Sequence, residues 1–83
     1  HDALPISIKK VEMTKSSLEQ AKENLRTTKD NFEEGMAKST DVLEAQSMWQ
    51  EAYADYIEAM TEHKLNKTKL MKASGQLIQS DKQ

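Results

Sequence analysis

The sequence predicts an all-α fold, a long antiparallel helical hairpin of coiled-coil type, and three observations support this prediction. Helix-favouring residues, chiefly Ala, Leu, Glu, Lys, Gln and Met, dominate the 83 residues, whereas glycine occurs twice and proline once. Apolar and small residues recur at alternating spacings of three and four in two long segments. Gly35 is the only glycine between these segments, so we expect the chain to reverse there.

Composition excludes several classes of protein. The chain has no cysteine, so we expect neither a disulfide framework nor a cysteine-ligated metal site. Its formal net charge of -2 does not indicate nucleic-acid binding. No apolar run is long enough for a membrane-spanning helix, and any export signal of a parent protein would lie outside this sequence.

The hairpin is expected to occupy residues 8–77, with a helix over about 8–34, a turn at 35–39 and a helix over about 40–74. Residues 1–7 do not share the pattern, and Pro5 disfavours helix at Leu4, so they are interpreted as a non-native or disordered extension. Residues 78–83 are interpreted as a tail.

Each helix carries a seam on which larger and smaller residues alternate. In the first helix the seam positions are Val11, Thr14, Leu18, Ala21, Leu25, Thr28 and Phe32. In the second they are Val42, Ala45, Trp49, Ala52, Tyr56, Ala59, His63, Asn66, Leu70, Ala73 and Leu77. Antiparallel helices pack densely when a large residue faces a small one.

Two registers satisfy this rule, with facing residue numbers that sum to 77 or to 70. We prefer 77, which places Leu18 opposite Ala59 and centres the reversal between Lys38 and Ser39. Gly35 is expected at the position that follows the first helix, where positive φ is needed. Ser39, Thr40 or Asp41 is expected to cap the second helix, with Asp41 and Glu44 at capping-box spacing.

The second helix has a further apolar stripe beside its seam, formed by Leu43, Tyr53, Ile57, Met60 and Met71. One partner helix cannot cover both surfaces. Such a helix sits either between two neighbours, as in a sheet of helices or a barrel wall, or in a bundle with a wide core face.

No catalytic constellation is visible in the sequence, and we predict neither enzyme activity nor a cofactor. His63 lies on the seam with Ala59 and Lys67 four residues away on either side, so we interpret it as a packed or partly solvated seam histidine and not a metal ligand. Acidic residues cluster near the turn, and those that end the first helix, Glu33 and Glu34, are not explained by the helix dipole.

The residues around the turn resemble a known family. The run from Phe32 to Gln46 reads F-x-x-G-M-A-x-x-x-D-V-L-E-A-Q, and the helix after it ends in L-M-K-A-S-G-Q-L at residues 70–77. This pattern is similar to the last helical hairpin of TolC-type outer-membrane efflux proteins, over about residues 17–77.

The resemblance implies a homotrimeric channel whose helices form a barrel across the periplasm, beneath a small β-barrel in the outer membrane that is not part of this sequence. The tip, Gly35, Met36, Ala37 and Lys38, would contact a periplasmic adaptor protein and, through it, an inner-membrane pump. Asp41 and Glu44 would form acidic rings at the pore aperture.

Two positions depart from the family pattern, which often has Tyr in place of Phe32 and in some members Arg in place of Ala37. Phe32 cannot form a hydrogen bond and Ala37 cannot pair with a carboxylate, so the polar lock of the family is not carried over. The expected function is that of a transport component: its helices form part of the wall of an efflux or secretion channel, its tip docks to an adaptor, and its acidic residues lie at the gated aperture. The alternative is a stand-alone antiparallel coiled-coil interaction module.

Overall fold

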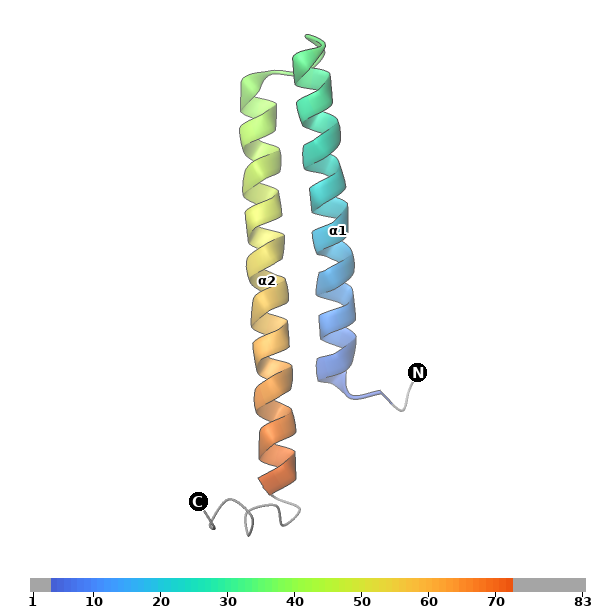
Figure 1. Cartoon of the computed structure of the whole chain (residues 1–83), viewed down its shortest axis with the longest axis vertical. Coiled ribbons are helices and arrows are strands. Elements are labelled where there is room, and N and C mark those ends of the chain that lie inside the picture. The colour runs from blue at the N-terminus through green and yellow to red at the C-terminus, as the bar shows by residue number, and fades with distance from the viewer. Residues whose placement is uncertain (1–3, 73–83) are drawn as a thin grey trace.

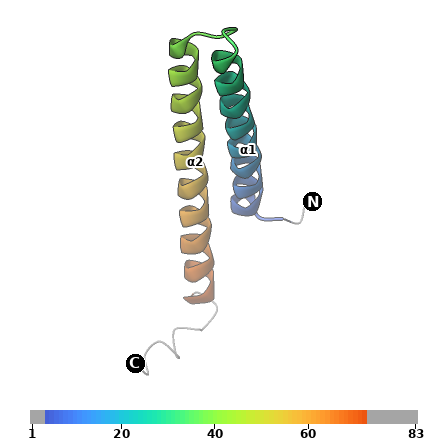
Figure 2. The same cartoon turned by 45° about the horizontal axis from the view of Figure 1, so that its top comes forward.

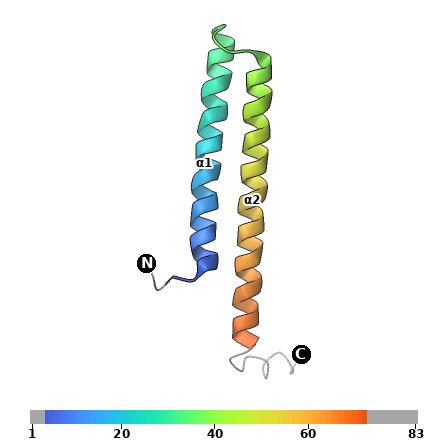
Figure 3. The ribbon, with the colours of Figure 1, turned by 180° about the vertical axis from the view of Figure 1, so that it is seen from behind.

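The computed structural model describes residues 4–72 and confirms the all-α helical hairpin (Figure 1). Helix α1 spans Ile6–Glu33 and helix α2 spans Ser39–Met71. The two helices run antiparallel and lie side by side in all three views of the ribbon (Figures 2 and 3). The molecule is elongated, with a longest extent of 63 Å.

Helix α1 begins two residues earlier than expected. Pro5 precedes it in an extended conformation, and the Pro5 carbonyl accepts hydrogen bonds from the amides of Ile8 and Lys9 at 3.1 and 3.2 Å. Pro5 lacks an N–H group, and this costs nothing at the start of a helix because the first amides of a helix have no carbonyl within the helix to donate to. Ile6 and Ser7 are therefore helical, and the expectation that they belong to a disordered extension is wrong.

The end of α2 is only partly described. Residues 73–74 of the expected helix, the seam residues Ala73 and Leu77, the family-like end of the helix around Gly75 and the tail at 78–83 all lie outside the described residues. Helix α2 is described to Met71.

The predicted seam is the buried face of the hairpin. Its half-buried or buried members are Val11, Thr14, Leu18, Ala21, Leu25 and Thr28 in α1 and Val42, Ala45, Trp49, Ala52, Tyr56, Ala59 and His63 in α2. Among the described residues only Ala45 and Ala59 are fully buried, at 3% and 1% exposure. The core is thus a single line of contacts in which small residues of α2 let the helices approach closely.

The predicted seam is wrong at both ends. Phe32 is 46% exposed, and Asn31 beside it is half-buried instead. At the other end Asn66 and Leu70 are exposed, because α1 starts at Ile6 and has too few residues to cover them.

The register is the one whose facing residue numbers sum to 70, so the preferred sum of 77 is wrong. Ser7 forms a hydrogen bond with His63, and Lys10 forms an ion pair with Glu62. These contacts place Leu18 opposite Ala52, not Ala59. The sum of 77 would instead shift α2 by seven residues and bring Lys69 to the place that Glu62 holds beside Lys10, which like charges disfavour. In the observed register Phe32 lies level with Lys38, which precedes α2, and this explains why Phe32 is uncovered.

Candidate functional site

The turn at the tip of the hairpin is built on Gly35. Gly35 has φ of +80°, and no atom within 4 Å would meet an added Cβ. Its amide donates to the Phe32 carbonyl at 3.0 Å, and the Met36 amide donates to the Asn31 carbonyl at 2.7 Å. This pair of hydrogen bonds is the Schellman motif that closes helix C-termini. The prediction that Gly35 follows the helix with positive φ is confirmed.

The cap of α2 differs from the prediction. Lys38 is the N-cap residue, so Ser39, Thr40 and Asp41 occupy the first turn of the helix instead of preceding it. The Lys38 amide donates to Asp41 Oδ2 at 2.9 Å, which is the acidic half of a capping box. The Lys38 side chain has no acceptor, so its backbone carbonyl alone receives the amides of Asp41 and Val42. The predicted capping box between Asp41 and Glu44 is wrong, because Asp41 stands at its third helical position.

The predicted partner-contacting residues form the tip itself. Gly35, Met36 and Lys38 are exposed, Met36 to 67%, and Ala37 is half-buried. They lie at the end of the molecule where the chain passes from α1 to α2, at the top of Figure 1. No other part of residues 4–72 covers this end, so a partner approaching along the long axis would meet these four residues first.

The two predicted aperture carboxylates lie near each other in the sequence but differ in their hydrogen bonding. Asp41 and Glu44 are both exposed. Asp41 is held by the Lys38 amide, whereas Glu44 forms no hydrogen bond or ion pair within residues 4–72. The Asp41 carboxylate is therefore positioned by the backbone, and the Glu44 carboxylate is not positioned by any contact within residues 4–72.

Sequence reasoning missed that this acidity continues along the helix. Every acidic residue of α2 falls within an arc of about 100° on the helical wheel. These residues are Asp41, Glu44, Glu51, Asp55, Glu58 and Glu62. Their spacing of three, four and seven is visible in the sequence and could have been found by placing the charges on the heptad.

A shallow groove of about 460 Å³ runs along this acidic side. Its floor includes Ala21 of α1 and Ala52 of α2, and Glu51 and Asp55 border it on α2. The side chains that α1 contributes, such as Asn24, carry no charge. The groove side of the hairpin is thus acidic on one helix and neutral on the other.

The further stripe on α2 is exposed, as its position predicted. Leu43 is 62% exposed, and Tyr53, Ile57, Met60 and Met71 are also exposed. The ring of Tyr53 stacks on Trp49 with centroids 5.9 Å apart, which joins the stripe to the seam. The hairpin therefore leaves a second apolar surface uncovered.

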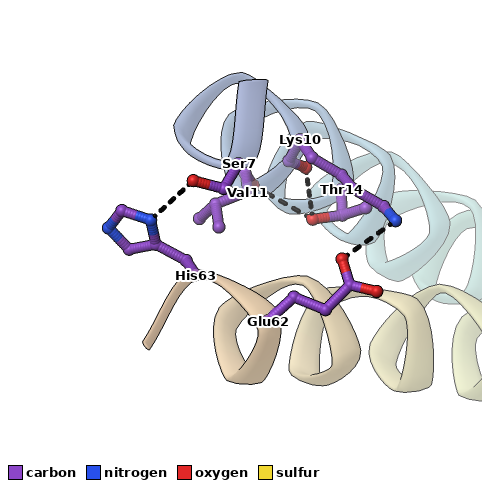
Figure 4. A network of polar contacts seen from close by, with 6 residues as sticks. All are labelled: Ser7, Lys10, Val11, Thr14, Glu62 and His63. Carbon is purple, nitrogen blue, oxygen red and sulfur yellow. Dashed lines mark hydrogen bonds and ion pairs between the residues drawn. The ribbon is translucent and has the colours of Figure 1, made fainter. Parts of the chain in front are cut away.

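A polar network closes the open end of the hairpin (Figure 4). Ser7 Oγ lies 2.9 Å from His63 Nδ1, and Lys10 Nζ lies 3.2 Å from Glu62 Oε1. His63 is half-buried on the seam, as predicted. The described residues hold no group of three or more His, Cys, Asp or Glu side chains that could bind a metal ion.

On α1 one charge cluster shows a pKa effect. Arg26 donates to Glu23 and to Asp30, with 3.1 Å between Nη1 and Asp30 Oδ2. Hydrogen bonding and attraction from the Arg26 guanidinium lower the pKa of Glu23 below its ordinary value, and hydrogen bonding and attraction from the Glu23 carboxylate raise the pKa of Arg26.

Neither described helix has the length and apolar character needed to cross a membrane. Comparison of the chain with protein-family models, with curated proteins and with solved structures finds no match.

Proposed function

We propose that this chain is a periplasmic helical hairpin of a trimeric outer-membrane efflux or secretion channel, with its tip directed toward a periplasmic adaptor. The observation that carries the proposal is the second apolar surface of α2, formed by Leu43, Tyr53, Ile57 and Met60 outside the seam. A helix with two apolar surfaces needs two neighbours, as helices in the wall of a barrel have. The likeness of the tip sequence to TolC-type proteins adds to this argument.

In this proposal the tip residues Gly35, Met36, Ala37 and Lys38 contact the adaptor, which joins the channel to an inner-membrane pump. The exposure of Gly35, Met36 and Lys38 and the hydrogen-bonded Schellman closure of the turn suit a docking surface, because a backbone that is already fixed loses little entropy on binding. Asp41 and Glu44 face the pore near its aperture and favour cations there.

The mechanism would be conformational. Adaptor binding at the tip would shift the hairpin between closed and open packings against its neighbours, without covalent chemistry. The capping bond between Lys38 and Asp41 links the tip to the first turn of α2, so movement of the tip would carry the Asp41 carboxylate with it.

The docking role is tested by Gly35→Glu in the full-length parent, with Gly35→Ala as the matched control. Both substitutions place an L-residue at φ of +80° and bear the same backbone strain, but only glutamate adds bulk and charge to the tip. We expect Gly35→Glu to reduce efflux well below that of Gly35→Ala at equal outer-membrane assembly. Equal efflux by the two variants would refute docking at this residue.

The aperture role is tested by Asp41→Asn with Glu44→Gln in single-channel recordings. Loss of two carboxylates from each of three subunits should lower the selectivity for cations over anions. Glu58→Gln is the control, because Glu58 lies on the same acidic side but far from the tip. Unchanged selectivity in the double variant would remove this pair from the aperture.

A stand-alone coiled-coil interaction module is the second candidate. The two helices bury their seam against each other, and hydrogen bonds within the turn cap the end of α1 and the start of α2. A stand-alone module requires both, because it has no further helices to pack against. Sedimentation of the 83-residue chain separates the candidates: a soluble, discrete species would favour the module, and concentration-dependent association without a defined end point would favour a wall element that lacks its neighbours.

A further inference from the structure

Three lysines of α1 form a row that has no partner among the residues that the structure describes. Lys15, Lys22 and Lys29 are spaced seven residues apart, so they lie on one side of the helix with a rise of about 10.5 Å between them. All three are exposed. Within residues 4–72 none of them forms an ion pair or a hydrogen bond, whereas Lys10 and Arg26 on the same helix do. We call Lys15, Lys22 and Lys29 the lysine row.

The lysine row lies on the same face of the hairpin as the uncovered apolar residues of α2. At the open end, Ile8 and Lys67 line one pocket of about 330 Å³. The lysine row follows Ile8 at intervals of seven residues, and Met60 and Tyr53 precede Lys67 at the same interval. Residues seven apart lie on the same side of a helix, so both sets lie on the side of the hairpin that this pocket occupies. Leu43 and Ile57 extend the apolar surface on the side away from α1. This face is opposite the side of the hairpin that holds the acidic groove, and the Lys10 to Glu62 ion pair lies on that acidic side, at heptad steps from the groove residues Ser17 and Asp55.

We propose that this face binds an amphipathic helix of a partner protein, with an apolar seam over Leu43, Tyr53, Ile57 and Met60 and a row of carboxylates against the lysine row. The proposed channel gives the same apolar surface to a neighbouring wall helix, so within that function the proposal specifies the charge pattern of this neighbour. Lys15 to Lys29 covers two heptad steps and Leu43 to Met60 covers about 26 Å of helix, so the contact needs a partner of about three heptads.

A second copy of this chain fits the face less well. The edge of the apolar surface away from α1 carries Ser47, Ala54 and Thr61, which are uncharged. A copy docked through the same surface in parallel orientation would bring this neutral edge to the lysine row. In antiparallel orientation it would bring a second lysine row. Neither arrangement supplies carboxylates.

An anionic membrane surface also fits less well. The next heptad position of α1, farther from α2, carries Glu12, Glu19 and Glu33, and its fourth member, Arg26, is already paired with Glu23 and Asp30. A flat anionic surface would meet these carboxylates together with the lysines and be repelled by them. A single helix beside α2 would contact the inner lysine row alone.

The test uses the 83-residue chain and two synthetic three-heptad peptides. Both have Leu and Ile on the seam, and they differ only in carrying Glu or Lys at one flanking heptad position. We expect the Glu peptide to bind at least tenfold more tightly than the Lys peptide, since three exposed ion pairs of about 0.5 kcal/mol each amount to about tenfold in affinity. The preference should shrink as NaCl rises from 50 to about 500 mM.

Two triple variants of equal charge change locate the binding face. Lys15→Gln with Lys22→Gln and Lys29→Gln should remove the preference for the Glu peptide. Met13→Glu with Gln20→Glu and Thr27→Glu lowers the net charge by the same amount on the other flank of α1 and should keep it. Tyr53→Ser with Ile57→Ser should abolish binding of the Glu peptide. Circular dichroism of each variant verifies that the hairpin is intact.

Several outcomes would overturn the proposal. The first is equal affinity of the chain for the two peptides, and the second is equal loss of the preference for the Glu peptide in the two triple variants. The third is no binding of either peptide at 100 μM, roughly the range of a weak specific contact. A homodimer that competes with the peptide would assign the face to a second copy. Sedimentation with phosphatidylserine vesicles, lost in the lysine-row variant, would assign it to a membrane. None of these results bears on the efflux and conductance tests of the channel.

Discussion

Ser7 Oγ lies 2.9 Å from His63 Nδ1, although the two residues are 56 positions apart in the sequence. This contact joins the first turn of α1 to a seam residue of α2 and selects one of two registers that pack large against small residues. In the other register His63 would face Thr14, which instead donates its hydroxyl to the backbone carbonyls of Lys10 and Val11 in its own helix.

The register can be tested through the ion pair next to this contact. Lys10→Glu should destabilise the hairpin, and adding Glu62→Lys should restore it, because the pair is re-formed with reversed charges. Both side chains are about half exposed, so we expect a coupling energy of about 0.5 kcal/mol by urea denaturation in a double-mutant cycle. The control pair is Lys10→Glu with Lys69→Glu. Coupling in the control pair instead would support the register that sums to 77.

Gly35→Ala should lower the free energy of unfolding by about 1 kcal/mol, because the site requires positive φ and an L-residue is strained there. The space around Gly35 is open, so steric contact adds nothing to this cost. Gly35→Asn should cost less, since asparagine adopts this conformation more readily. Equal stability of the Ala variant and the parent chain would contradict the Schellman closure.

Asp41→Ala should destabilise the hairpin by about 1 kcal/mol, because it removes the acceptor of the Lys38 amide and a favourable charge at the N-terminus of α2. Glu44→Ala is the matched control and should change stability by less than about half of that, since Glu44 has no partner within the described residues. Thermal unfolding followed by circular dichroism measures both. The reverse order of effects would show that Glu44 is the capping residue.

Ala59→Leu should destabilise the hairpin by about 1–3 kcal/mol, because Ala59 is fully buried and a larger side chain would force the helices apart. Ala54→Leu makes the same chemical change at an exposed position of α2 and should be nearly neutral. Chemical denaturation of both variants is the measurement. Similar stabilities would mean that the helices do not approach each other at Ala59.

Arg26→Gln should raise the pKa of Glu23 toward its ordinary value of 4.5, because the guanidinium that favours the carboxylate is removed. A group whose pKa is lowered on folding stabilises the fold above its unfolded pKa, and this contribution is lost as pH falls through the folded pKa. The parent chain should therefore lose this contribution below about pH 4.5, and the variant should lack it at every pH. NMR titration of the Glu23 carboxyl carbon is the test, with Lys29→Gln as a control that leaves it unchanged.

Much of the hairpin could be predicted because the properties that determine it belong to short segments of the chain. The heptad spacing of residues such as Leu18 and Ala52 sets which side of each helix is buried, whatever the helix packs against. Gly35 closes α1 because glycine alone takes positive φ without strain. The exposure of Leu43 and Ile57 likewise follows from their place beside the seam.

The caps and the ends of the seam could not be predicted in the same way. A lysine is an unfavourable N-cap, yet Lys38 holds this place because Asp41 reaches back to its amide from within the helix. Phe32 fits the heptad as well as Leu25 does, but the chain leaves no α2 residue opposite it. The acidic row of α2 follows from the sequence only when the charges are placed around the helix, because its members are separated by three, four or seven residues along the chain.

The sequence by itself determined the two helices, their buried sides and the place of reversal, because helix periodicity and glycine conformation are properties of short segments. Only the tertiary structure decided how far one helix is displaced along the other. The alternation of large and small residues repeats every seven positions, so seam packing alone accepts either register. The contacts of Ser7 with His63 and of Lys10 with Glu62 occur in one of them only.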